Sequence, residues 1–431
     1  MKRMRRGFPQ WILWSLVAAG AVTGGRLVAL DVEAQGQTVQ APRFVVAPTW
    51  PRPLPDHRLL GSAVGLAVDS RDHVYVLNLT DSFTGRTETG ANQTPPIGEC
   101  CFPSLAVLEF DAEGSLVGQW GGPGEGQEWP IASHGLAIDN AGNIWIGGRG
   151  GLDTRLMKFS RDGKLLMQIG EARTLPAGRA AGAAAPDTAY AGVAPGRGQA
   201  GRGGRGGRGG RGAPPPSLPP DSRSRTSFGG PASVSFDAAV NEAFVADGYR
   251  NRRVAVIDMN TGAIKRFWGA FGNQPDDAVS APDRQFGTPV TCAEVSVDGF
   301  VYVCDRSNNR IQVFRKDGSF VKEKAVMPGT RGAGSVWDVT FSRDPQQRFL
   351  YVADGANQKV HVLDRQSLEV LTSFGARGRQ PGQFYGVHSV ATDSSGNLYT
   401  VEDLEGKRVQ KFTFQGIGAV SREQGVLWPR R

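Results

Sequence analysis

HGLAIDNAGNIWIGG, residues 134–148, is one of six copies of a strand-turn-strand phrase that decides the fold of this chain. Each copy has an apolar first run, a turn with Asp, Gly or Asn, and a second run rich in Val, Tyr, Ile and Phe, which is the pattern of a β-hairpin. The other copies are VGLAVDSRDHVYVLN from Val64, ASVSFDAAVNEAFVADG from Ala232, TCAEVSVDGFVYVCD from Thr291, WDVTFSRDPQQRFLYVADG from Trp337 and HSVATDSSGNLYTVE from His388. Six such hairpins predict a repeat architecture.

Two further strands follow several of these hairpins, so one unit is a four-stranded antiparallel meander. RLMKFSRDGKLLMQIG follows the second copy and NRIQVFRKDGSFVKEKA follows the fourth, and each has an Asp-Gly turn at its middle. Four-stranded units repeated at roughly 40 to 50 residues are typical of a β-propeller. We therefore expect an all-β fold, a six-bladed β-propeller of four-stranded antiparallel blades.

The first and last parts of the repeat region are predicted to pair. The sixth unit ends near Phe414 without an outer strand, whereas Phe44-Val45-Val46 is a strand with no partner nearby in the sequence. If this N-terminal strand completes blade six, the ring is closed and no long unpaired edge remains between the first and last blades.

The chain is expected to contain four kinds of segment. We predict an export signal over residues 1–34, a six-bladed propeller over 41–418 and a C-terminal tail over 419–431. Residues 171–227 interrupt the period between blades two and three with an Ala-, Gly-, Pro- and Arg-rich insertion. This insertion cannot bury enough apolar surface to become ordered, so we expect it to be disordered.

The N-terminal segment has the features of a secretory signal. A basic region precedes an apolar stretch from Trp11 to about Val22, and a plausible cleavage site follows at Val32-Glu33-Ala34. We expect a cleaved signal and a periplasmic or secreted protein; an uncleaved segment would anchor it to a membrane. The pair Arg5-Arg6 also fits twin-arginine export, and the sequence leaves both routes open.

The basic charge of the chain is concentrated in two segments. Of the net charge of +8, residues 1–34 carry +3 and residues 171–227 carry +6, which leaves −1 for the rest. A nearly neutral folded body predicts no nucleic-acid partner. The Arg-Gly-Gly tract has no interleaved aromatic residues, so we interpret it as a solvated linker.

Four cysteines are too few for a disulfide scaffold. Cys292 and Cys304 lie on the two arms of one predicted hairpin, and Cys100 and Cys101 are adjacent in a loop. An oxidising compartment could join either pair, and unpaired thiols are the alternative for both.

The first residues of the hairpin phrases are the candidate metal ligands. In a six-bladed ring the heads of copies two, four and six stand about 120° apart and converge on the axis. These heads are His134, Thr291 and His388. Two imidazoles suit a zinc ion, whereas a neutral hydroxyl is a poor ligand, so the sequence predicts two-thirds of a three-histidine site. The alternative is that both histidines line the channel and hydrogen-bond the backbone.

Tyr249 is the candidate general base. It lies in the loop Asp247-Gly248-Tyr249-Arg250-Asn251, which leaves the second strand of blade three. The Asp and Asn of such loops are turn formers, but the turn does not account for the Tyr. Near a bound cation its phenol could accept a proton; a structural Tyr is the alternative.

At these residues the chain resembles the NHL-repeat propellers. The pattern D-x-x-N-x-R-[VI] occurs in one copy from Asp305 to Ile311, and GRQPGQF at 378–384 is a typical phrase between blades. Within that family the chain is similar to peptidyl-α-hydroxyglycine α-amidating lyase, a six-bladed zinc enzyme that releases glyoxylate from a C-terminal α-hydroxyglycine. The resemblance implies zinc at His134 and His388 and a base at Tyr249.

The chain departs from that family at three positions. Thr291 replaces a zinc histidine, Asn78 and Leu79 stand where the family has an arginine, and Ser389 replaces an Asp after the last histidine. We therefore expect an exported scaffold that binds a protein, peptide or small molecule at the channel mouth, with a degenerate metal site. The alternative is a zinc-dependent lyase; a carboxylate-caged lactonase is a distant third.

Overall fold

A computed structural model of the protein describes residues 38–83, 87–124, 128–149, 153–171, 218–279 and 281–429. All described residues belong to one compact unit, Gln37–Arg431. The predicted export signal over 1–34 therefore lies outside the described residues, as do residues 172–217 of the predicted insertion.

The first three blades are four-stranded antiparallel sheets, as the sequence predicts. Blade one contains β3 (Ser62–Val68), β4 (Val74–Leu79), β6 (Val107–Phe110) and β7 (Leu116–Trp120). Blade two contains β8 (Ser133–Ile138), β9 (Ile144–Gly148), β10 (Leu156–Phe159) and β11 (Leu165–Ile169). Blade three contains β12 (Pro231–Asp237), β13 (Glu242–Asp247), β14 (Arg253–Asp258) and β15 (Ile264–Trp268).

Three more antiparallel sheets complete the ring. Blade four contains β16 (Val290–Val295), β17 (Phe300–Asp305), β18 (Arg310–Arg315) and β19 (Phe320–Ala325). Blade five contains β20 (Asp338–Phe341), β21 (Phe349–Asp354), β22 (Lys359–Asp364) and β23 (Val370–Phe374). Blade six contains β24 (Val387–Thr392), β25 (Leu398–Glu402), β26 (Arg408–Ser421) and β1 (Thr38–Val46). The prediction of a six-bladed β-propeller is confirmed.

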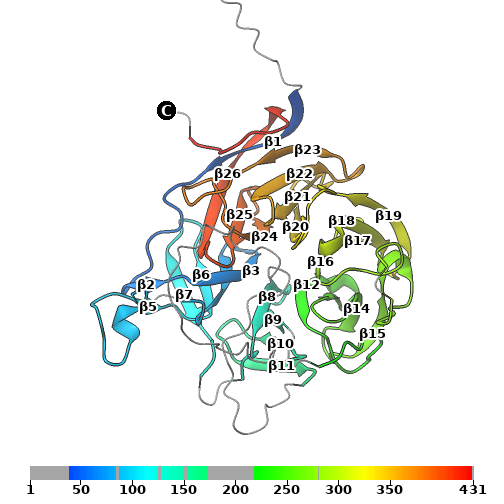
Figure 1. The fold of residues 1–431 in the computed structure, drawn as a ribbon, viewed down its shortest axis with the longest axis horizontal. Coiled ribbons are helices and arrows are strands. Elements are labelled where there is room, and N and C mark those ends of the chain that lie inside the picture. The colour runs from blue at the N-terminus through cyan, green and yellow to red at the C-terminus, as the bar shows by residue number, and fades with distance from the viewer. Residues whose placement is uncertain are drawn as a thin grey trace, which may run out of the picture. The chain divides into compact units, whose positions relative to one another are not determined.

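The N-terminal strand closes the ring. Strand β1 pairs antiparallel with β26 as the outer strand of blade six, with Phe44 opposite Phe414. The first strands of neighbouring blades contact one another in the order β3, β8, β12, β16, β20, β24 and back to β3, and they surround the axis (Figure 1). The predicted closure by the N-terminal strand is confirmed, and it covers the edge that blade six would otherwise expose.

The hydrophobic core lies between adjacent blades. Val64 and Tyr75 of blade one pack in one buried cluster with Ile144 and Met157 of blade two. Each sheet is therefore apolar on both faces, which explains why the second strand of each hairpin is a nearly continuous apolar run.

Turn chemistry fixes the hairpins. The side-chain oxygen Oδ1 of Asp139 accepts hydrogen bonds from the backbone amides of Ala141 and Asn143. Gly142 follows with a φ of 81°, a conformation that a glycine adopts without strain. Asp69 and Asp393 accept equivalent bonds in their own hairpins. The interpretation of these aspartates as turn residues is confirmed.

The acidic residue that ends the second strand has a role beyond the turn. Asp305 is fully buried and forms a 2.7 Å ion pair with Arg310 on the next strand, and Asp247 pairs with Arg253 at 2.8 Å. Removing one partner of such a buried pair would leave an uncompensated charge. The sequence interpretation of these residues as turn formers alone was therefore too narrow.

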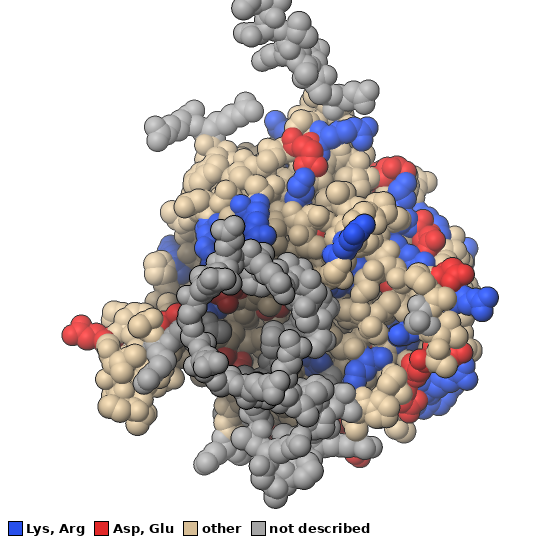
Figure 2. Space-filling model, in the orientation of Figure 1, with Lys and Arg blue, Asp and Glu red and all other residues tan. Residues whose placement is uncertain are grey.

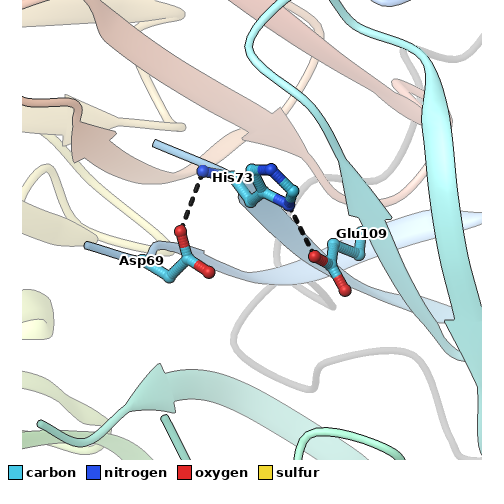
Figure 3. Close-up of side chains that lie close together, drawn as sticks. All are labelled: Asp69, His73 and Glu109. Carbon is cyan, nitrogen blue, oxygen red and sulfur yellow. Dashed lines mark hydrogen bonds and ion pairs between the residues drawn. The ribbon is translucent and has the colours of Figure 1, made fainter. Parts of the chain in front are cut away.

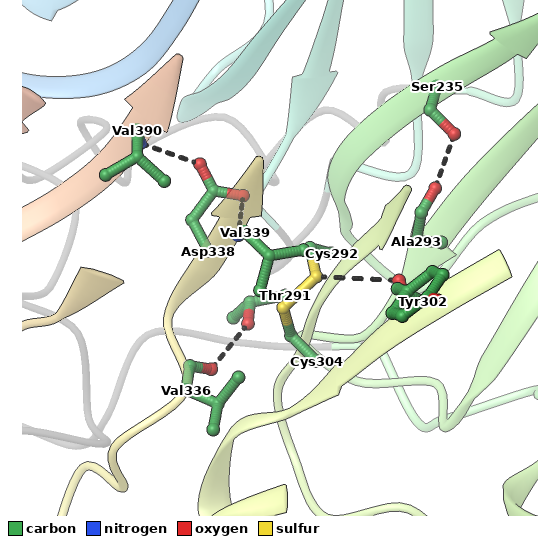
Figure 4. Close-up of a disulfide and its surroundings, with 10 residues drawn as sticks. All are labelled: Ser235, Thr291, Cys292, Ala293, Tyr302, Cys304, Val336, Asp338, Val339 and Val390. Atoms are coloured by element: carbon green, nitrogen blue, oxygen red, sulfur yellow. Dashed lines mark hydrogen bonds between the residues drawn. A yellow bond between two sulfur atoms is a disulfide. The ribbon is translucent and has the colours of Figure 1, made fainter. Parts of the chain in front are cut away.

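Two disulfides are present. Cys292 and Cys304 join β16 to β17 at a cross-strand position, with their Cα atoms 4.8 Å apart (Figure 4). Cys100 and Cys101 are joined to each other in the loop between β4 and β6. The same loop contains the short 3₁₀ helix η1 (Gly90–Asn92) and β5 (Phe102–Pro103), which pairs with β2 (Arg58–Leu59).

The surface of the described residues carries mixed charge. In the face that Figure 2 shows, basic and acidic side chains are interspersed, and pairs such as Lys324 with Glu369 join neighbouring blades. Among the described residues, no helix has the length and apolarity needed to cross a bilayer.

Candidate functional site

Two of the three alternate heads meet at the axis. His134 is the second residue of the first strand of blade two and His388 the second residue of the first strand of blade six, 254 positions apart in the sequence. Their Nε2 atoms lie 3.1 Å apart, and the residues are only 2% and 5% exposed. The structure thus brings together the two histidines that the head positions predicted.

The opposite ring nitrogens of these histidines are held by the protein. Nδ1 of His134 lies 3.0 Å from the carbonyl oxygen of Ala232, which can only accept a hydrogen bond. His134 therefore carries a proton on Nδ1, and in the neutral ring its Nε2 is a hydrogen-bond acceptor. Nδ1 of His388 lies 2.9 Å from Oγ of Ser389. Such partners on Nδ1 orient imidazoles that bind metal through Nε2.

Tyr249 completes the cluster. Its phenol oxygen lies 2.7 Å from Nε2 of His134, and the two rings meet edge to face at 4.8 Å. Gly248 makes this approach possible, because a Cβ at that position would lie 1.9 Å from the carbonyl oxygen of Val290. The Asp-Gly-Tyr sequence thus gives the loop both its close contact with blade four and a tyrosine that reaches the axis.

Thr291 does not join this cluster in the structure. Its hydroxyl donates a 3.3 Å hydrogen bond to the carbonyl oxygen of Val336, at the start of blade five (Figure 4). A hydroxyl used in this way is satisfied within the protein. The third head therefore contributes to the packing between blades four and five.

Two arginines near the cluster were not singled out from the sequence. Arg149 follows the second strand of blade two, and its guanidinium lies 6.0 Å from the centre of the Tyr249 ring. Arg306 follows the second strand of blade four and stacks on Trp337 at 3.6 Å, while Trp337 meets His388 edge to face at 5.8 Å. Both arginines occupy the same strand-end position, which is the signal that would have found them.

The inner wall also carries two acidic residues that the sequence analysis missed. Burial raises the pKa of the Asp338 carboxyl to about 7, against the effect of the hydrogen bonds it accepts from Val390, Val339 and Ser389. Burial, and then the neighbouring charge of Asp338, raises the pKa of Glu294 well above its usual value. A carboxyl that resists ionisation in this way holds a proton more readily than one in water.

The donor atoms of the cluster fit a metal ion of the zinc type. Two nitrogen ligands of a tetrahedral zinc ion, each bonded at about 2.0–2.1 Å, lie about 3.3 Å apart. The 3.1 Å separation of the Nε2 atoms of His134 and His388 is close to that spacing. The oxygen of Tyr249 offers a third donor, 2.7 Å from Nε2 of His134.

A second group of potential ligands lies between blades one and two. Side-chain donors of Asp69, His73 and Glu109 approach within 4.8 Å of one another (Figure 3). However, Glu109 also pairs with Arg71 and Arg161, and Asp69 pairs with Arg71. Burial acts to raise the pKa of Glu109, but hydrogen bonds from His73 and Arg161 outweigh it and lower the pKa. Because two guanidinium groups already neutralise this group, it joins the blades and does not fit a cation.

The comparisons with known proteins agree with the fold. The NHL repeat family model matches residues 293–314, within blade four. Peptidyl-glycine alpha-amidating monooxygenase B of Xenopus laevis is 27% identical over 197 residues, which cover 44% of this chain and 21% of that protein. The A form from the same organism is 36% identical over 100 residues, 23% of this chain and 10% of its own length. The chain thus spans about a fifth or less of these relatives.

Two solved lyase structures are among those that align with the chain. A streptogramin B lyase aligns with a TM-score of 0.43 and 10% identity over 87% of this chain and 98% of its own. The virginiamycin B lyase of Staphylococcus aureus with quinupristin aligns with a TM-score of 0.42 and 12% identity, covering 88% and 89%. The chain is therefore a six-bladed β-propeller that carries an NHL repeat in blade four and is distantly similar to the peptidyl-glycine alpha-amidating monooxygenases.

Proposed function

We propose that this protein is a metal-dependent lyase that cleaves a C–N bond in a small substrate bearing a carboxylate, with α-hydroxyglycine peptides as the first class to test. The observation that carries the proposal is the convergence at the channel axis, where Nε2 of His134 lies 3.1 Å from Nε2 of His388 and 2.7 Å from the phenol oxygen of Tyr249. Similarity to the amidating monooxygenases supports this reaction class.

His134 and His388 are the residues that would hold the metal. A bound zinc ion supplies Lewis acidity, which polarises a substrate oxygen. Each imidazole is oriented through Nδ1, by the carbonyl of Ala232 or by Ser389, so that both Nε2 atoms face the same point. This orientation is set before any ligand arrives, which reduces the cost of binding.

Tyr249 is the residue that would move the proton. Its phenolate oxygen accepts the proton of the substrate hydroxyl as the C–N bond breaks, the hydroxyl carbon becomes a carbonyl and the leaving nitrogen takes a proton from solvent. The guanidinium of Arg149, 6.0 Å from the ring, favours negative charge on the phenol. Arg149 thus offers, from blade two, the cation that Asn78 and Leu79 do not supply from blade one.

The substrate carboxylate is attracted by the two arginines near the cluster. Arg149 and Arg306 come from blades two and four, on either side of blade three, which carries Tyr249. A planar guanidinium suits a carboxylate because it can donate two parallel hydrogen bonds. A neutral substrate should therefore bind less well than its carboxylate counterpart.

The test is turnover with a peptide that ends in α-hydroxyglycine. Purified protein with one equivalent of zinc should release glyoxylate, and a chelator should stop the release. The same peptide with its terminal carboxylate amidated should react more slowly. If the protein binds zinc but releases no glyoxylate, the proposed lyase reaction is contradicted.

A ligand-binding scaffold is the second candidate function. It is favoured by Thr291, whose hydroxyl is used in a hydrogen bond to Val336 and adds no third ligand from blade four. In that case the channel mouth binds a peptide or small anion without chemistry. Binding of the intact hydroxyglycine peptide with no product would support this candidate.

We also propose that the protein is exported to the periplasm or secreted. Two disulfides support this, because such bonds persist in oxidising compartments. The N-terminal segment supplies the signal.

A further inference from the structure

The two disulfides of this chain differ in their exposure to solvent. Cys292 and Cys304 are both 0% exposed and lie in the buried cluster between blades four and five. Cys100 is exposed and Cys101 is half-buried, in the loop between β4 and β6. A thiolate attacks a disulfide only where it can reach a sulfur atom, so exposed disulfides are the ones that exchange readily. The bond between Cys100 and Cys101 is therefore the one that an external thiol can reach.

The two disulfides also differ in the length of chain that they close. Cys292 and Cys304 are 12 positions apart on two strands, whereas Cys100 and Cys101 are neighbours in the sequence. A disulfide stabilises a fold mainly because it restricts the unfolded chain, and this effect grows with the length of the closed loop. A bond between adjacent residues closes almost no loop, so its contribution to stability should be small.

The loop that carries Cys100 and Cys101 is held to the propeller by other contacts. The amide of Phe102 in β5 donates a 3.0 Å hydrogen bond to the carbonyl oxygen of His57, next to β2. At the other end of the loop, Glu88 forms a 2.9 Å ion pair with Lys407 of blade six. These contacts do not involve the disulfide, so the sulfur–sulfur bond can open without releasing the loop.

Apolar side chains on both sides of the disulfide are open to solvent. Ile97 is 49% exposed, Phe102 39% and Leu105 40%, and residues 87–105 include no Lys or Arg. This loop, which the labels β2 and β5 mark in Figure 1, projects in Figure 2 as a lobe on the left with few charged side chains. Exposed apolar residues gathered in one place are typical of a surface that binds another protein.

We propose that Cys100 and Cys101 form a thiol-exchange site, and that the partner is a protein dithiol that docks on the apolar side chains of Ile97 and Phe102. A thiolate of the partner attacks Sγ of Cys100, which is the more exposed of the two residues. The sulfur–sulfur bond breaks, and Cys101 leaves as a thiolate that takes a proton from solvent.

A second thiolate completes the exchange. The other thiolate of the partner attacks the partner's own sulfur in the mixed disulfide, and Cys100 leaves as a thiolate that also takes a proton. The partner ends as a disulfide, while Cys100 and Cys101 end as two thiols. Two electrons have thus passed from the partner to the loop, and the reverse reaction returns them.

The first measurement compares the two disulfides within one protein. Folded protein is treated with increasing dithiothreitol, quenched with acid and alkylated with N-ethylmaleimide, and the labelled cysteines are identified by mass spectrometry. Cys100 and Cys101 should be labelled at concentrations of dithiothreitol that leave Cys292 and Cys304 unlabelled. Labelling of all four cysteines at the same concentration would overturn the proposal.

The second measurement tests the docking surface, with reduced thioredoxin as the probe. Ile97→Ser combined with Phe102→Ser should slow the reduction of the loop disulfide by thioredoxin about tenfold, because two apolar contacts are lost. The rate with dithiothreitol should stay within about twofold of wild type, since a small dithiol needs no docking surface. Val240→Ser is the matched control, because Val240 is also 49% exposed but lies in the 3₁₀ helix η3 (Ala238–Val240) of blade three. If thioredoxin reduces the double variant at the wild-type rate, or if Val240→Ser slows the reaction equally, the docking surface is wrong.

The third measurement distinguishes a reactive disulfide from a structural one. Cys100→Ser combined with Cys101→Ser should leave the thermal midpoint within about 2 °C of wild type, whereas Cys292→Ser combined with Cys304→Ser should lower it by several degrees. An equal fall in both double variants would give the loop disulfide a structural role and contradict the proposal. None of the three measurements involves zinc or glyoxylate, so they test the exchange site whether or not the lyase function holds.

Discussion

Two histidine clusters in this propeller contain similar ligand atoms but differ in the charge around them. His73 lies with Asp69 and Glu109 between blades one and two, where Arg71 and Arg161 neutralise both carboxylates. His134 and His388 lie at the axis with Tyr249, where they contact one another, a backbone carbonyl and hydroxyl groups. Proximity of ligand atoms is therefore a poor criterion for a metal site; what matters is whether a cation already balances them.

Removal of either axial histidine should cause the largest change, a loss of zinc affinity. His134→Ala and His388→Ala should each lower zinc affinity by about 100-fold or more, because a single remaining imidazole cannot hold the ion. His73→Ala should leave zinc affinity within about twofold of wild type. Metal content after dialysis, measured by elemental analysis, checks all three variants. If His73→Ala lost as much zinc as the two axial variants, the cluster between the blades would be the metal site.

Removal of the phenol oxygen tests the chemistry at the axial cluster. Tyr249→Phe should lower kcat by about 10²- to 10⁴-fold, the usual contribution of a general acid or base. Zinc should still bind, because His134 and His388 remain. Glyoxylate release measured at saturating zinc checks this expectation. Wild-type turnover in Tyr249→Phe would assign the proton transfer to another group.

A substitution in the cluster of Asp69, His73 and Glu109 should lower the stability of the fold and leave zinc affinity unchanged. Glu109→Gln removes the charge that pairs with Arg161 and His73, and the Glu109 side chain is only 11% exposed. Loss of one partner of such a part-buried pair should lower the free energy of unfolding by about 1–3 kcal/mol. Denaturant unfolding measures the change. The zinc affinity of Glu109→Gln should equal that of wild type, and a loss of affinity without a loss of stability would reverse the roles of the clusters.

The smallest expected effect is a pH dependence on the inner wall. Burial raises the pKa of Glu294, so the folded state binds this proton more tightly than the unfolded state. Glu294 therefore destabilises the fold as pH rises above the ordinary glutamate range. Glu294→Gln should raise the thermal midpoint at pH 8, and the gain should shrink as pH falls toward 4.5. An equal rise of the thermal midpoint at pH 8 and at pH 4.5 would contradict the ionisation of buried Glu294 as the cause.

The fold could be predicted from the sequence because the hairpin pattern recurs in every blade. An apolar run and an Asp-Gly turn, as at Asp139 and Gly142, repeat often enough to fix blade number and strand order. The pairing of Phe44 with Phe414 followed from the missing strand of blade six. Such features are local or periodic, so one chain contains all the information needed.

The site was only partly predictable, because its other residues come from different blades and have no periodic signal. The head position identified His134 and His388, and the Asp-Gly-Tyr loop identified Tyr249. The strand-end position marks Arg149 and Arg306, but it does not show that Arg149 lies beside Tyr249, or that Asp338 accepts a hydrogen bond from the amide of Val390 in blade six. Those contacts depend on the rotation between blades, which a sequence pattern does not encode.

The most direct test of the account is X-ray absorption at the zinc edge on protein loaded with one equivalent of zinc. The account predicts two imidazole nitrogen ligands completed by oxygen ligands in wild type and one imidazole in His388→Ala. An identical spectrum in wild type and His388→Ala, or a first shell of oxygen alone, would contradict the claim that the axial histidines form the metal site.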